Sequence, residues 1–166
     1  AATPAAAVAR AITTRSRLEL LAPLGPVYQA GTLSGNPVAV AAGLATLRLA
    51  DDAVYSRLNQ VAETLSAETS AALSAEGVEH VVQHAGNLFS FVFAPEAPLN
   101  FAEVKAQQGY RYAPFFHSML ESGVSLPPSV FEAWFVSAAH DDGVVSKIVE
   151  ALPAAAKAAA AASAPQ

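Results

Sequence analysis

The spacing of the apolar residues changes near Gly77, and this change limits what the chain can fold into. Before Gly77, apolar residues recur every three, four or seven positions from Val54 to Ala72, which predicts a long amphipathic helix. After it, residues 78–83 and 87–93 form two short apolar runs, which predict strands. A helix leading into a strand pair indicates helices packed on a sheet.

The second of these strands carries three aromatic side chains at alternate positions. Phe89, Phe91 and Phe93 fall on one face because successive side chains of a strand point to opposite sides. Residues 84–86 are predicted to form the turn between the strands, and Pro95 helps to end the second one. We therefore expect the three phenylalanines to lie in the core.

Helix-starting residues predict further helices along the chain. Asn and Asp accept hydrogen bonds from the first free N–H groups of a helix, and Pro fits its first turn. These signals place helix starts at Asn36-Pro37, at Asp51 or Asp52, at Pro114 and at Asp141 or Asp142. Residues 124–126 and 133–137 are further strand candidates, and the Ala-rich tail after Pro153 either continues as helix or frays. The predicted class is α/β, an α+β arrangement in which helices cover a small, mainly antiparallel sheet.

Composition disfavours several functions. The net charge is −5 without a local Lys/Arg cluster, which argues against nucleic acid. The sequence contains no run of about 20 apolar residues, so a membrane span is not expected. Residues 1–10 do not resemble a secretory signal. The chain contains no cysteine, so disulfides and zinc–thiolate sites are excluded. A cytoplasmic protein without nucleic-acid or membrane partners is expected.

Residues 31–37, Gly-Thr-Leu-Ser-Gly-Asn-Pro, are the segment most suggestive of a binding site. Small residues allow close backbone approach, two hydroxyls are present, and the N–H groups of a helix start attract anions. The segment thus has the chemistry of a phosphate site. An ordinary glycine-rich loop with an asparagine cap is the alternative, and these features alone leave both open.

Two blocks of sequence resemble a known family. Residues 26–37, Pro-Val-Tyr-Gln-Ala-Gly-Thr-Leu-Ser-Gly-Asn-Pro, are similar to the signature of the glutamate-1-semialdehyde aminomutase family, which belongs to the class-III pyridoxal-phosphate-dependent aminotransferases. Residues 115–137 agree with a second block, and the resemblance covers residues 21–152. It implies the C-terminal portion of a fold-type I enzyme, with a remnant of the large cofactor-binding domain in residues 1–36, connecting helices in 37–76 and a small C-terminal α+β domain in 77–166.

The resemblance also implies a binding site. Thr32 would hold the phosphate of pyridoxal or pyridoxamine 5'-phosphate in the active site of the partner subunit, which implies a homodimer. Gly31 and Ser34 would shape the cofactor-binding loop. The residues expected near the substrate pocket are Tyr28, Gln29 and Glu132.

Glu132 has two interpretations from its own surroundings. It lies in an apolar run with Phe131, Trp134 and Phe135, and a buried carboxylate requires a partner or a raised pKa. Alternatively, it is a water-facing carboxylate at a strand edge. The residues alone do not decide between these.

Metal binding and hydrolase chemistry are not expected. The spacing of His80 and His84 suits ligands on a helix, yet both fall in a strand-like region where this spacing does not converge. His117 shows no second ligand nearby, and His140, which follows a Ser-Ala-Ala stretch, is expected to have a helix-capping or core role. Ser129 and Ser137 have no convincing His/Asp partners for a triad.

The chain departs from the family at the catalytic lysine. In the family this lysine forms a Schiff base with the cofactor and lies upstream of the glycine-rich segment, whereas Lys105, Lys147 and Lys157 all lie downstream. No catalytic residue is therefore predicted here, and the chain alone is expected to be inactive.

The full-length parent is expected to be an isomerase of tetrapyrrole (porphyrin) biosynthesis. It would convert the small-molecule substrate glutamate-1-semialdehyde to 5-aminolevulinate by intramolecular amino transfer. Two alternatives stay open: another class-III aminotransferase that uses an external amino donor, and a non-catalytic dimerisation or regulatory module.

Overall fold

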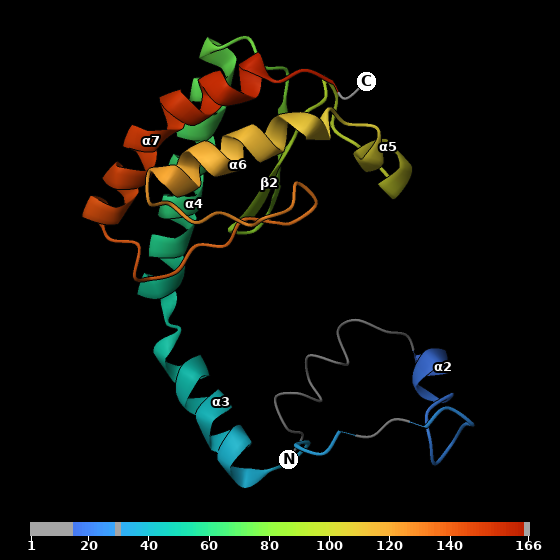
Figure 1. Cartoon of the computed structure of the whole chain (residues 1–166). Helices are drawn as coiled ribbons and strands as arrows, with labels where there is room; N and C mark the ends of the chain where they lie inside the picture. Colours follow the sequence, from blue (N-terminus) through green and yellow to red (C-terminus); the bar gives the residue numbers. More distant parts are fainter. Residues whose placement is uncertain (1–14, 29–30, 165–166) are drawn as a thin grey trace. The chain divides into compact units, whose positions relative to one another are not determined.

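The computed structural model describes residues 15–28 and 31–164 (Figure 1). Their contacts define two compact units, residues 1–48 and residues 49–166. In the first unit, helix α2 (Arg15–Leu18) precedes a bend in which Leu21 and Val27 form an isolated bridge. Residues 1–14 of this unit lie outside the described part of the chain.

Helix α3 (Pro37–Leu49) begins where the Asn-Pro signal predicts. The Asn36 side-chain oxygen accepts hydrogen bonds from the N–H groups of Val38 and Ala39, at 3.0 and 3.2 Å. Gly35 precedes this cap with φ of +75°, a conformation that costs glycine little and other residues more. None of the residues of α3 is buried.

Helix α4 (Asp52–Ala75) opens the second unit and confirms the predicted amphipathic helix. The Asp51 side chain accepts from Val54 N–H at 2.9 Å, so Asp51 is the cap. The helix ends at Ala75, and Gly77 follows with a φ of +67° and an N–H that donates to the Ser74 carbonyl. Its apolar stripe is buried against the rest of the unit.

Strands β1 (Val81–Ala85) and β2 (Leu88–Val92) form an antiparallel hairpin, with Val81 opposite Val92 and Ala85 opposite Leu88. The predicted first strand, residues 78–83, and turn, residues 84–86, are therefore placed too early. The turn is Gly86-Asn87, because Gly86 adopts φ of +62° at the first central position of a two-residue loop.

The two further strands predicted at residues 124–126 and 133–137 are wrong. Within the described residues, the sheet has only β1 and β2. Residues 124–126 are followed by Pro127 and Pro128, which have no N–H to donate to a ladder. In the second segment only Trp134 pairs, through a bridge in which its N–H donates to Phe89 O at 2.7 Å.

The segment between the hairpin and the next helix contains structure that the sequence interpretation missed. Helix α5 (Phe101–Lys105) is capped by Asn100, whose side chain accepts from Glu103 N–H. A 3₁₀ turn (Gly109–Arg111) then leads into α6 (Tyr112–Glu121). Helix α6 thus starts two residues before Pro114, which lies in its first turn, where a missing N–H costs little.

Helix α7 (Asp142–Ala161) is capped by Asp141 and continues through Pro153. Its buried face lies on both sides of the proline and packs against α4 and α6, which offsets the lost helix hydrogen bond. Helices α4, α6 and α7 and the hairpin enclose one core (Figure 1). The predicted α+β class with a small antiparallel sheet is confirmed. The core includes Phe89, Phe91, Phe93, Phe115, Met119 and Leu152.

Candidate functional site

The glycine-rich loop forms a pair of tight turns directly before α3. The Ser34 N–H donates to the Gly31 carbonyl at 3.0 Å, and the Asn36 N–H donates to the Leu33 carbonyl at 3.1 Å. Gly31, Thr32 and Ser34 are thereby brought together within a single turn. All three are exposed.

Gly31 is required by the way this turn folds. A Cβ atom added to Gly31 would lie 2.5 Å from Ser34 Oγ, closer than two unbonded atoms approach. Ser34 therefore folds over a position that only glycine leaves open. This arrangement keeps the Ser34 hydroxyl beside the backbone of the loop.

The donors that the loop offers to a ligand differ from those expected. Asn36 already accepts from the first N–H groups of α3, so the helix start does not supply them freely. Among the described residues, the hydroxyl of Thr32 and the N–H groups of Thr32 and Leu33 have no hydrogen-bond partner. The anion-binding capacity of this region thus lies in the turn itself.

The residues predicted near the substrate pocket are placed differently. Tyr28 is 82% exposed, and Gln29 lies outside the described residues. Glu132 is exposed and belongs to the second unit, where its N–H donates to Ser129 O at 3.1 Å. Of the two interpretations of Glu132, the structure supports the carboxylate that faces water in this chain. The alternative, burial in an apolar run, does not hold in this chain, because Phe131 and Phe135 are exposed as well.

The stretch that carries Glu132, residues 127–134, is called the Glu132 segment below. Its last residue, Trp134, is buried, and its ring lies 5.5 Å from the Phe89 ring and 5.2 Å from the Phe91 ring. Its first residue, Pro127, accepts a hydrogen bond from the Tyr112 hydroxyl at 2.5 Å. The two ends of the segment are therefore fixed to the core.

Tyr112 is a functional candidate that sequence reasoning missed. Burial raises the pKa of Tyr112 to about 12; a hydrogen bond donated by the Trp134 side chain lowers it, and the negative charge of Glu132 raises it. Tyr112 is therefore protonated at neutral pH and able to donate. Tyr112 lies just before the helix predicted from Pro114, and its neighbours in the sequence gave no signal of this contact.

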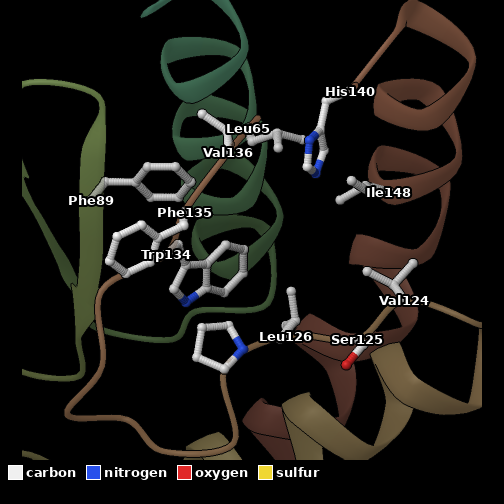
Figure 2. A pocket seen from close by; sticks show the side chains of 11 residues that line it. Leu65, Phe89, Val124, Ser125, Leu126, Trp134, Phe135, Val136, His140 and Ile148 are labelled. Atoms are coloured by element: carbon white, nitrogen blue, oxygen red, sulfur yellow. The ribbon is translucent and has the colours of Figure 1, made fainter. Parts of the chain in front are cut away.

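A small cavity of about 70 Å³ lies beside the Glu132 segment (Figure 2). Its walls are mostly apolar and include Trp134, Phe89 and Ile148, with the imidazole of His140 at one side. That imidazole is engaged with Ser137, whose N–H donates to His140 Nδ1 at 3.1 Å. The cavity has room for a few waters at most.

Other side chains that could take part in chemistry form contacts within the fold instead. Lys105 lies over the Phe101 ring at 5.2 Å. His80 is held between the Ser70 hydroxyl, at 2.7 Å, and the Val78 carbonyl, at 2.8 Å. In the described part of the chain, no three His, Cys, Asp or Glu residues are grouped to hold a metal ion, and no helix is long and apolar enough to cross a membrane.

Solved structures with the same fold are transaminases. An omega-transaminase from Sphaerobacter thermophilus aligns with a TM-score of 0.66 and 22% identity, over 88% of this chain and 34% of the other. A structure described as a transaminase with PLP bound aligns with a TM-score of 0.68 and 21% identity, over 89% of this chain and 34% of the other. At these identities the likeness establishes the fold alone, and it supports the predicted fold class.

Sequence comparison is more specific. The model of the class-III aminotransferase family matches residues 3–152, and the chain belongs to this family. Glutamate-1-semialdehyde 2,1-aminomutases from two strains of Tropheryma whipplei, Twist and TW08/27, are each 58% identical over 142 residues, or 86% of this chain. The chain spans 30% of the length of these relatives.

Proposed function

We propose that the chain is the C-terminal part of a glutamate-1-semialdehyde 2,1-aminomutase. The observation that carries this proposal is the 58% identity to enzymes of that name over 86% of the chain. The parent enzyme would exchange the amino and oxo groups on neighbouring carbons of glutamate-1-semialdehyde to give 5-aminolevulinate, the porphyrin precursor. No amino group is gained or lost overall, so the reaction is an isomerisation.

The proposal includes pyridoxal 5'-phosphate, whose phosphate fits the glycine-rich loop. The Thr32 hydroxyl and the N–H groups of Thr32 and Leu33 are unpaired among the described residues, and phosphate oxygens accept such donors. Gly31 leaves room for Ser34 to fold inward. When bound, the cofactor supplies the carbon that carries the amino group and the ring that accepts electrons. This chain would bind its phosphate through Thr32, with Gly31 and Ser34 shaping the site.

The proposal also places the loop in the active site of a partner subunit, within a cytoplasmic homodimer. Exposure supports this: Tyr28 and Thr32 face solvent, and none of the residues of the adjoining helix α3 is buried. An apolar helix with no residue buried within its own chain has a surface that a second protein chain can cover. Tyr28, Gln29 and Glu132 are proposed to lie near the small-molecule substrate in the assembled enzyme.

The activity test uses the protein that contains this chain, supplied with glutamate-1-semialdehyde and no amino donor. We expect 5-aminolevulinate to form at a rate that an added amino donor does not raise. If product appears only with an added donor, the protein is another class-III aminotransferase and not an aminomutase. A natural protein with an intact mass near 17.0 kDa and no activity would instead support the non-catalytic module.

The cofactor site is tested by Thr32→Val in the same protein. Loss of a hydrogen bond to a charged phosphate is expected to weaken pyridoxal-phosphate affinity by roughly tenfold or more, because such bonds contribute about 1.5–3 kcal/mol. Thr46→Val is the matched control, since the Thr46 hydroxyl donates to Ala42 O within α3. Equal cofactor affinities for the two variants would show that Thr32 does not bind the cofactor.

A further inference from the structure

The Tyr112 hydroxyl joins helix α6 to the beginning of the Glu132 segment. It donates to the carbonyl of Pro127, where the segment begins, at 2.5 Å. The other end, Trp134, is held by its own N–H, which donates to Phe89 O at 2.7 Å, and by its ring against Phe89 and Phe91. Tyr112 thus fixes one end of the segment to a rigid helix, and strand β2 fixes the other.

The middle of the segment points away from these anchors. Glu132 N–H donates to the Ser129 carbonyl, and Phe131 N–H donates to the Ser129 hydroxyl at 3.2 Å, which makes a compact turn. Phe131 is 56% exposed and Glu132 is exposed, whereas Tyr112 and Trp134 are buried. The segment is thus built from a half-buried beginning at Pro127, a buried end at Trp134 and an exposed turn that presents a carboxylate.

Packing beneath the segment is incomplete. The cavity of about 70 Å³ is lined in part by Pro127 and by Trp134, the first and last residues of the segment. Side chains next to a void lack partner atoms on that side and resist displacement less. The hydrogen bond from Tyr112 therefore adds to the restraint at the beginning of the segment, where no aromatic contact is formed as it is at Trp134.

We propose that Tyr112 is a positioning residue for Glu132: its hydroxyl fixes the beginning of the Glu132 segment and thereby the place at which the carboxylate meets the substrate. This inference rests on the proposed function, which puts Glu132 near the substrate. Tyr112 itself does not contact the substrate in this arrangement. Because its pKa of about 12 keeps the hydroxyl protonated, the anchor persists throughout the neutral pH range.

The test is a double-mutant cycle with Tyr112→Phe and Glu132→Gln in the protein that contains this chain. Tyr112→Phe alone is expected to raise KM for glutamate-1-semialdehyde about three- to tenfold, the worth of one or two hydrogen bonds, with kcat changed less. In the Glu132→Gln background, Tyr112→Phe is expected to have no further effect on kcat/KM. Equal losses in the two backgrounds would overturn the inference, because Tyr112 would then act independently of Glu132.

Amide hydrogen exchange of residues 129–133 provides a readout that does not depend on activity. Tyr112→Phe is expected to speed this exchange, whereas Tyr110→Phe, which removes a hydroxyl bonded to Gln108 at 3.0 Å, is the matched control and leaves it unchanged. An active protein whose segment exchanges at the wild-type rate after Tyr112→Phe would overturn the inference alone. A wild-type protein that forms no 5-aminolevulinate would overturn the proposed function and, with it, the role of Tyr112.

Discussion

Replacing Trp134 with alanine is expected to destabilise the second unit strongly. Trp134 is 5% exposed and lies against Phe89, Phe91 and Phe115, with ring centroids 5.5, 5.2 and 6.3 Å away. A tryptophan buries roughly 150–250 Å², which corresponds to about 4–6 kcal/mol at 25 cal/mol per Å². Alanine keeps part of this burial, so the expected loss in unfolding free energy is about 3–5 kcal/mol.

The control is Phe135→Ala, one residue further along. Phe135 is 73% exposed, so its truncation is expected to cost less than about 0.5 kcal/mol. Urea unfolding followed by far-ultraviolet circular dichroism suits both variants, because Trp134 is the only tryptophan and its fluorescence disappears with the substitution. A Trp134→Ala midpoint within error of the Phe135→Ala midpoint would show that Trp134 does not anchor the segment to the core.

Further predictions concern glycine and tyrosine. Gly35→Ala is expected to destabilise the start of α3 by about 1–2 kcal/mol because φ is +75° there, whereas Gly43→Ala, within the helix and with open space around it, stabilises α3 by up to about 1 kcal/mol. Amide exchange in α3 measures both effects. A change of stability in the same direction for the two variants would contradict the backbone conformation assigned to Gly35. The pKa of Tyr112 is raised from 10.0 to about 12 in the folded chain. Its contribution is therefore full below pH 10 and lost as pH rises towards 12, so unfolding free energy is expected to fall more steeply over that range in wild type than in Tyr112→Phe.

The features that the sequence predicted well are those set by neighbouring residues. Asn36, Asp51 and Asp141 cap the helices that follow them because each cap needs only a short side chain and the next few N–H groups. The apolar periodicity of α4 and the alternation of Phe89, Phe91 and Phe93 are similarly local. For the same reason, Asn100 and Glu103 carried a usable capping signal for α5 that was overlooked.

The features that it did not predict depend on distant partners. The position of Trp134 in the core depends on Phe89 and Phe91 in strand β2 and on Phe115 in helix α6, all of which lie well before it in the sequence. The apolar residues around Glu132 suggested a buried strand, yet only one residue of that run, Trp134, pairs with the sheet. Periodicity cannot separate a strand from a turn with one buried anchor, because both contain the same residue types.

The geometry of the glycine-rich loop also limits what the proposed phosphate site contributes. Asn36 occupies the N–H groups that made the helix start attractive for an anion, which leaves the hydroxyls and amides of the turn. The sequence contains no Lys or Arg between Arg17 and Arg48, so the loop itself carries no positive charge. A phosphate bears between one and two negative charges near neutral pH, and hydrogen bonds alone do not neutralise them. Under the proposed function, the loop therefore supplies orientation, and the charge that balances the phosphate comes from groups outside residues 18–47. This division is what a site assembled from two protein surfaces requires.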